Sequence, residues 1–226
     1  MTTTTARVPR RDALDNRAAL LAAARAVFAN DPDASLDAVA AEAGLSRRSV
    51  YGHFASRDEL QRELVTEGAE RVTLALDSVT HPDPVVRLAL IGAGLWAEVA
   101  DMRVMTLFAV RGPLAQHTAA GLAPLRRRVL DSVREATEAG RARSDIPPER
   151  LARLVEAAAL AVLEESTRSE LSASEGRRLV MLNVLAALGF GWREAAALVE
   201  QTPELPPRDR LVQDPSQKNA SQKDAS

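Results

Sequence analysis

Apolar residues recur three and four positions apart along most of this chain, and this spacing gathers them on one face of an α-helix. Turn-forming residues separate these stretches, as at Asp31-Pro32-Asp33, Gly112-Pro113 and Pro147-Pro148. The pattern therefore predicts an all-α fold.

The predicted helices and the composition of the two ends divide the chain into five parts. We expect a flexible basic arm over residues 1–11, a three-helix helix-turn-helix domain over 12–60, a connecting helix over 61–80, a larger helical domain over 81–202 and a disordered tail over 203–226. The tail is rich in Pro, Gln, Ser and Asp, and such a composition buries too little apolar surface to fold.

The periodicity also predicts which helical faces are buried. In the first helix, 12–30, one stripe contains Leu14, Ala18, Leu21 and Phe28. Residues 84–100 are apolar on nearly every side, so we expect a central buried helix there. Further helices are expected over residues 102–110, 123–139, 147–167, about 174–188 and 192–201, with Ser172 or Ser174 capping the fourth of them.

A tight turn between two short helices is predicted around Gly44. The first helix, 35–43, must stop there, because the left-handed backbone that ends a helix costs glycine little. Ser46 can cap the second helix by accepting a hydrogen bond from a free backbone N–H. This arrangement is a helix-turn-helix pattern. Its second helix is expected to bury Val50 and Phe54 against Phe28, Val39 and Ala41.

The opposite face of this second helix has the chemistry of a DNA reader. At about 100° per residue, that face and its flanks hold Arg47, Arg48, Ser49, Tyr51, Gly52 and His53. An arginine that donates two hydrogen bonds to a guanine discriminates bases by about 1–3 kcal/mol. A glycine inside a helix costs roughly 1 kcal/mol relative to alanine, and a site without a side chain would let the backbone approach the groove. The alternative is an ordinary solvated basic helix.

The net charge of the chain, −2 at pH 7, does not by itself indicate a nucleic-acid partner. The placement of charge matters more, because a phosphate attracts the groups within its reach. Residues 46–57 contain Arg47, Arg48 and Arg57 and no acidic residue. We therefore expect a small basic patch whose affinity for DNA depends on salt.

Residues 14–64 resemble the DNA-binding domain of the TetR (tetracycline-repressor-like) family of transcriptional regulators. The residues that carry the resemblance are Ala26-Val27-Phe28, Ser35-Leu36-Asp37-Ala38-Val39-Ala40, Ala43-Gly44-Leu45-Ser46, Val50-Tyr51-Gly52-His53-Phe54 and Ser56-Arg57-Asp58-Glu59-Leu60. The resemblance implies a homodimer that reads a palindromic site on double-stranded DNA and that a small ligand usually releases.

The same resemblance implies individual roles. It assigns phosphate contacts to Ser35, Tyr51, His53 and Arg57, and it directs Arg47, Arg48, Ser49 and Gly52 toward the groove. Gly52 stands where a larger side chain is usual in the family. Serine at 35 and arginine at 57 replace the commoner threonine and lysine.

The family comparison also implies a dimer interface formed by two late helices. The residues expected there are Leu151, Leu154, Ala158, Leu179, Leu182, Leu185 and Ala186. Taken alone, these stripes are equally consistent with an intramolecular core. Reading a palindrome requires two heads about 34 Å apart, which favours the dimer.

The larger domain contains a few residues suited to a small-molecule site. The candidates are Trp96, Met102, Met105, Phe108, Arg111 and His117, with Glu98 as a further polar group. Methionines fill adaptable surfaces, and a few polar groups orient a ligand in an apolar pocket. The alternative is that these residues are ordinary core and surface positions.

An enzyme is not expected. HExxH, GxSxG and a glycine-rich phosphate loop are absent, and only three histidines occur. Without cysteine there is no disulfide or thiolate metal site, so we expect no catalytic residue, metal or cofactor. No apolar run of about 18 residues and no signal-peptide core are found, so we expect a cytoplasmic protein without a membrane partner.

These observations predict a ligand-responsive transcriptional regulator, a repressor that a small, mainly apolar effector releases from DNA. The alternative is a DNA-binding dimer that is regulated by a protein partner or without any ligand. A closed apolar cavity would favour the first, and an exposed apolar patch would favour the second.

Overall fold

The computed structural model describes the backbone of residues 9–202 and the side chains of residues 13–202. Within that range it contains α-helices, one short 3-10 helix and no strand, which confirms the predicted all-α fold. The tail predicted over 203–226 and residues 1–8 of the predicted arm lie outside the described residues. Residues 9–11 of that arm belong to the first helix, which begins at Pro9 and not at Asp12.

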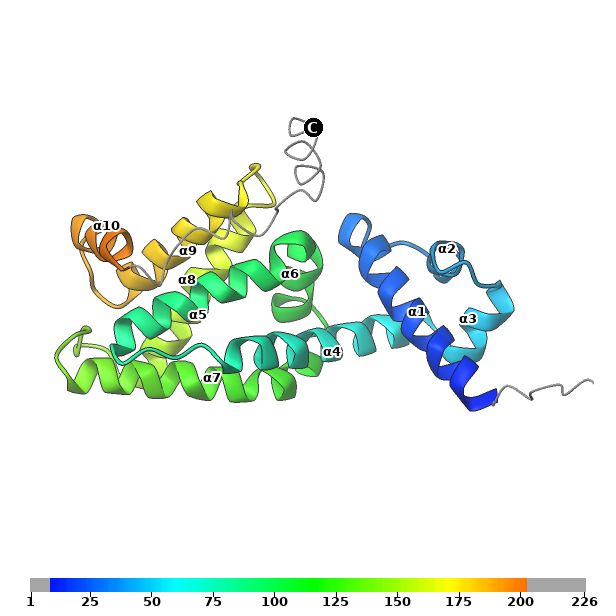
Figure 1. The fold of residues 1–226 in the computed structure, drawn as a ribbon, viewed down its shortest axis with the longest axis horizontal. Helices are drawn as coiled ribbons and strands as arrows, with labels where there is room; N and C mark the ends of the chain where they lie inside the picture. The colour runs from blue at the N-terminus through cyan, green and yellow to red at the C-terminus, as the bar shows by residue number, and fades with distance from the viewer. Residues whose placement is uncertain (1–8, 203–226) are drawn as a thin grey trace, which may run out of the picture.

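Two groups of helices are connected by one long helix (Figure 1). The group that we call the head contains α1 (Pro9–Asn30), α2 (Leu36–Glu42) and α3 (Arg47–His53). The connecting helix, α4 (Arg57–Asp77), leaves the head and runs alongside α7. The group that we call the body contains α5 (Pro84–Val99), the 3-10 helix η1 (Ala100–Met102), α6 (Arg103–Arg111), α7 (Ala115–Glu138), α8 (Pro148–Glu165), α9 (Ala173–Ala187) and α10 (Trp192–Gln201). No helix in the described part of the chain combines the length and apolar character needed to cross a membrane.

The head is held together by an apolar core at the centre of its helices. Phe28, Val39, Val50 and Phe54 are fully buried there, as the periodicity predicted. Gly44 ends the turn after α2 with a φ of 67°, and it therefore has the left-handed backbone that the sequence indicated.

Three residues predicted for this core lie at the surface instead. Leu14 is 67% exposed, and Ala18 and Ala41 are also exposed. Since α1 is much longer than α2 and α3, only its second half, with Leu20 and Ala24, meets the head core. The short α2 buries one face only, and Ala41 lies on the other.

The central helix of the body is α5, as predicted. It packs against α7 and α9, and it buries residues on several sides. One contact sets how α5 and α9 meet: the indole ring of Trp96 occupies the place that a side chain at Gly176 would need. The indole N–H also donates a hydrogen bond to the Ala173 carbonyl oxygen (3.1 Å).

Helix α7 begins at Ala115, well before the predicted start at residue 123, and continues through Pro124. A proline is best tolerated in the first turn of a helix, whereas Pro124 lies inside this one. Contacts with α4 support the additional turns. The Thr73 hydroxyl donates to the Gly121 carbonyl oxygen (2.7 Å), and Gly121 lets α7 approach Ala69 closely.

Polar contacts hold α4 at its middle and at its C-terminal end. Near the head, Arg25 of α1 forms an ion pair with Glu67 (2.9 Å). In the body, Arg128 of α7 donates hydrogen bonds to the carbonyl oxygens of Leu76 and Val79, both at 2.6 Å. These two bonds attach Arg128 to the C-terminal end of α4 and to the residues just after it, where a helix leaves carbonyl acceptors available.

The structure identifies Ser172, and not Ser174, as the cap of α9. Its hydroxyl accepts a hydrogen bond from the Glu175 backbone N–H (3.2 Å), and the Glu175 carboxylate accepts one from the Ser172 backbone N–H (3.0 Å). We predict that Ser172→Ala lowers the free energy of unfolding by about 1 kcal/mol, because the cap is lost. Urea denaturation measures this change. Ser174→Ala is the matched control, and an equal loss in both variants would contradict the assignment.

Candidate DNA-binding surface and ligand cavity

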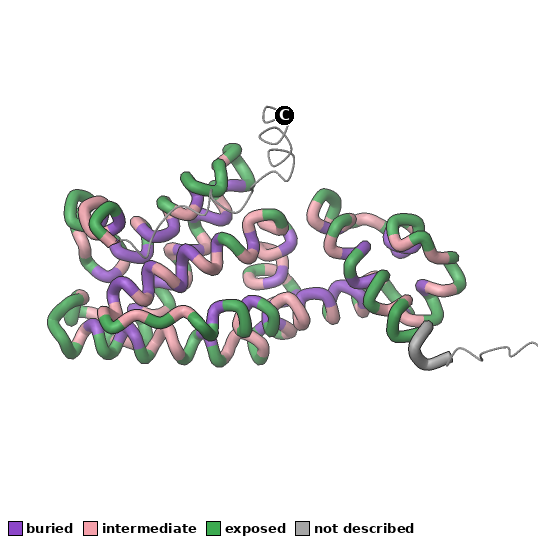
Figure 2. The backbone as a smooth tube through the Cα atoms, viewed as in Figure 1, coloured by how far each residue is buried: buried purple, intermediate pink, exposed green. Residues whose placement is uncertain are grey.

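Helix α3 turns its polar side away from the head core. Val50 is fully buried, whereas Arg48, Tyr51 and Gly52 are exposed, and the tyrosine keeps 51% of its surface accessible. Figure 2 shows exposed chain along the outer side of α2 and α3. The solvent-facing side of α3 is therefore the side that could enter a DNA groove.

The other residues predicted to contact DNA lie around this surface. Ser35 is the N-cap of α2, where its hydroxyl accepts a hydrogen bond from the Ala38 backbone N–H (3.2 Å). Ser49 and His53 are half-buried on α3. The contact of these residues with DNA stays a prediction.

The three arginines of this surface differ in their partners. Arg47 forms an ion pair with Asp37 of α2 (2.6 Å), and Arg57 donates to the backbone carbonyl oxygen of Asp33 (2.9 Å). Arg48 is exposed and makes no ion pair with any side chain in the described part of the chain. Among the three, Arg48 is therefore the one whose guanidinium can reach a base edge without leaving a carboxylate or carbonyl partner.

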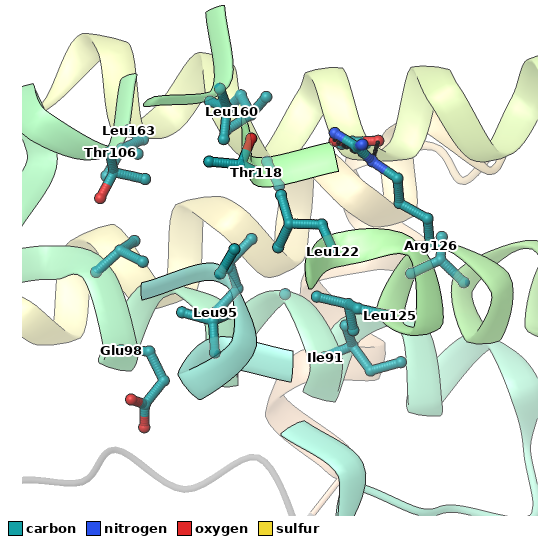
Figure 3. Close-up of a pocket in the computed structure, with 18 of the residues that line it drawn as sticks. Ile91, Leu95, Glu98, Thr106, Thr118, Leu122, Leu125, Arg126, Leu160 and Leu163 are labelled. Carbon is teal, nitrogen blue, oxygen red and sulfur yellow. Dashed lines mark hydrogen bonds and ion pairs between the residues drawn. The ribbon is translucent and has the colours of Figure 1, made fainter. Parts of the chain in front are cut away.

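The body contains a cavity of about 390 Å³ among α4 to α9 (Figure 3). Apolar side chains make up most of its lining, among them Ile91 and Leu95 of α5, Leu122 and Leu125 of α7, and Leu160 of α8. A cavity of this kind suits an apolar small molecule.

Three of the six residues predicted for a ligand site line this cavity: Trp96, Met102 and Met105. Trp96 and Met105 are 3% and 2% exposed, so each can contact a molecule only inside the protein. Glu98 also lines the cavity, but its carboxylate points away from the labelled apolar side chains (Figure 3).

The other three predicted residues, Phe108, Arg111 and His117, do not line the cavity. Phe108 packs against the head core, on another side of α6. Arg111 forms an ion pair with Glu164, and the hydrogen bond from Arg111 lowers the pKa of that carboxyl. The His117 ring lies beside the Gln116 amide (3.3 Å). The prediction is thus corrected for all three with respect to this cavity, because α6 and the start of α7 direct Phe108 toward the head core and Arg111 and His117 toward other partners.

Most residues that line the cavity were missed by the sequence analysis. Most of them are leucines, valines and alanines at helical spacing, and Gly68 and Thr118 are among the others. A stripe of this kind predicts a buried face. It does not predict whether that face meets another side chain or an empty volume.

Polar residues are a minority of the cavity lining, and several of them have partners. The Thr118 hydroxyl lies 3.0 and 3.3 Å from two backbone carbonyl oxygens. Arg126 and Glu156 both line the cavity and form an ion pair with each other (2.7 Å). A hydrogen bond from Arg134 lowers the pKa of the Glu149 carboxyl, which also lines the cavity. These four residues therefore offer little to a charged molecule.

The cavity lies where the head core and the body core meet. Its lining includes Leu64 and Val65 of α4 and Met105 and Ala109 of α6, all of which belong to the head core. Apart from Ala69, the other buried apolar side chains of the lining belong to the body core. A molecule in the cavity would therefore touch both cores.

The residues predicted for a dimer interface divide into two sets. Leu151 and Leu185 are fully buried in the body core, on the faces through which α8 and α9 contact other helices of the body, so they are not available to a second chain. The remaining five, which are at least partly exposed, are Leu154, Ala158, Leu179, Leu182 and Ala186. Their contact with a second chain stays a prediction.

Residues 20–64 match the family described as bacterial regulatory proteins, tetR family. The matched segment covers the second half of α1, both helices of the helix-turn-helix and the start of α4. Among curated proteins, none matches the sequence of this chain.

Solved structures share the fold of head and body together. The TetR-like transcriptional regulator LfrR from Mycobacterium smegmatis, in complex with proflavine, is 18% identical, with 80% of this chain and 99% of that chain covered and a TM-score of 0.62. SmeT, the repressor of the Stenotrophomonas maltophilia multidrug efflux pump SmeDEF, is 24% identical, with 76% and 88% covered and a TM-score of 0.60. FadR from Bacillus subtilis, in complex with stearoyl-CoA, is 14% identical, with 76% and 97% covered and a TM-score of 0.63.

Proposed function

We propose that this chain is a member of the TetR family of bacterial regulatory proteins and a transcriptional repressor that a small apolar molecule releases from DNA. Members of this family are DNA-binding transcription factors and not enzymes. The observation that carries the proposal is the apolar cavity between the two cores, because it joins a ligand site to the DNA-binding head.

On the DNA side, α3 enters the major groove with Arg48 toward the base edges. The exposed Tyr51 hydroxyl and the N-cap Ser35 contact phosphates beside it, which positions the head without selecting a sequence. Arg47 and Arg57 add positive charge, and each keeps an oxygen partner within the head. Affinity for DNA consequently falls as salt rises.

A homodimer presents two such heads to a palindrome. The exposed side of α8 and α9 supplies the interface, with Leu154 and Leu182 as its largest apolar contacts. Leu154 is 44% exposed in the isolated chain, and a second copy would remove this apolar surface from water. The two heads then stand about one helical turn of DNA apart.

Release follows from the position of the cavity. Helix α6 contributes Met105 and Ala109 both to the cavity lining and to the head core. A molecule that binds better when α6 and α4 are further apart shifts the population toward that state. The packing of the head against the body then changes, and the two heads no longer match the half-sites. The cavity supports this mechanism over regulation by a protein partner, which would require an exposed patch instead.

The first prediction concerns sequence reading. Affinity selection from a random duplex pool enriches an inverted repeat with the wild-type protein. Arg48→Ala relaxes the base preference at one position of each half-site, with a loss of about 1–3 kcal/mol of discrimination, because an arginine–base contact is removed. Tyr51→Phe is the control, and it weakens binding to all sequences alike. An unchanged preference in Arg48→Ala would show that this side of α3 does not read bases.

The second prediction concerns the dimer. Leu182→Arg places a charge in the proposed interface, so sedimentation analysis finds a monomer and operator affinity drops strongly. Leu74→Arg is the control, because Leu74 is 75% exposed on α4 and lies outside the proposed interface. If Leu182→Arg sediments like the wild-type dimer, the interface lies elsewhere.

A further inference from the structure

Two of the eleven glycines of this chain are not explained by its own structure. Every other glycine either has a positive φ or would place a Cβ within 3.3 Å of another group, so a side chain there is strained or crowded. Gly52 of α3 and Gly68 of α4 have neither property, and a Cβ built on either one has no heavy atom within 4 Å. Glycine inside a helix is unfavourable relative to alanine. The reason for glycine at these two positions therefore lies outside the chain, in a molecule that binds there.

The positions of these two glycines suggest which molecule each of them contacts. Gly52 lies on the exposed side of α3 that the proposed function directs toward DNA. Gly68 lies near the middle of α4 and lines the cavity, together with Leu64, Val65 and Val72 of the same helix. The space beside Gly68 is thus part of the cavity, and the bare backbone of α4 forms its wall there.

We infer that Gly68 is a contact site for the effector: an uncharged, apolar molecule lies against the backbone of α4 in the space that a side chain at position 68 would fill. This inference rests on the proposed ligand-binding function of the cavity, and it names where on the connecting helix the ligand makes contact.

The neighbouring contacts of α4 support this placement. Ala69, the next residue, packs closely against Gly121 of α7, where a Cβ on that glycine would lie 2.9 Å from the alanine. Helices α4 and α7 are therefore already in close contact on that side, and the space beside Gly68 is left over from their packing. No movement of α7 is needed to make room for a ligand there.

The chemistry of the lining sets the class of molecule. Arg126 and Glu156 neutralise each other, and Arg71 and Arg153 are exposed, so their charges are solvated. The Thr118 hydroxyl already has backbone partners. In the apolar part of the cavity, beside Gly68, a charged ligand would lose its water without gaining a partner, whereas an uncharged hydrocarbon-rich one would not.

A neutral fluorescent probe tests the inference without knowledge of the natural effector. N-phenyl-1-naphthylamine is uncharged and accepts excitation energy from tryptophan. The chain has two tryptophans, of which Trp96 lines the cavity and Trp192 is 72% exposed. In a Trp192→Phe background, energy transfer to the probe therefore comes from Trp96 alone and reports a probe bound near the cavity, and the Gly68 variants test whether it lies inside.

We expect Gly68→Ala to raise the melting temperature by about 2–4 °C, because alanine favours the helix and meets no neighbour. The same variant binds the probe at least about fivefold more weakly, because the added methyl group overlaps the ligand. Gly68→Leu fills more of the space and abolishes binding. Gly52→Ala is the matched control, and it leaves probe affinity unchanged while weakening operator binding.

The outcomes separate this inference from the proposed function. Wild-type probe affinity in Gly68→Ala and Gly68→Leu would overturn the inference, and so would a wild-type protein that does not bind the probe. An unchanged probe affinity with altered release from the selected operator would show that Gly68 is a hinge and not a contact. If the wild-type protein binds the probe at Gly68 but keeps its operator, the contact stands and the proposed release mechanism fails.

Discussion

One helix, α4, belongs to two hydrophobic cores at the same time. Leu60 and Leu64 pack into the head core, and Val72 and Leu76, further along the helix, pack into the body core. A continuous α-helix transmits a displacement at one end to the other, because its backbone hydrogen bonds leave it little freedom to bend. The orientation of the head is therefore tied to the packing of the body, and both proposed sites depend on this connection.

The polar contacts of α4 reinforce its two ends. Near the head, Arg17 pairs with Glu63, and its guanidinium also lies 5.1 Å from the centre of the Phe54 ring. At the other end, Arg128 holds the last carbonyl groups. Between these attachments, the side of α4 at Gly68 meets the open volume of the cavity. The helix is thus firmly attached where it enters each core and open to a ligand between them.

The head was largely predictable because its decisive interactions are local. The Ser46 hydroxyl accepts a hydrogen bond from the Ser49 backbone N–H (3.1 Å), and the Ser56 hydroxyl accepts one from the Glu59 backbone N–H (3.1 Å). Each bond spans three residues, so the residue types alone indicate it. The ion pair between Asp37 and Arg47 is different, since it crosses the turn between two helices. The angle between α2 and α3 decided that Arg47, and not its neighbour Arg48, forms this pair.

The sequence by itself determined the helical fold, the positions of most helix ends and the polar side of α3. These follow from hydrophobic periodicity and from capping groups within a few residues of one another. Only the tertiary structure decided that Leu151 belongs to the core while Leu154 is exposed, and that the leucines of α5, α7 and α8 surround an open volume. The physical reason is that the hydrophobic effect is not directional. It drives each apolar stripe out of water, but whether two stripes meet closely or leave a cavity depends on helix angles and on side-chain volumes from distant parts of the chain.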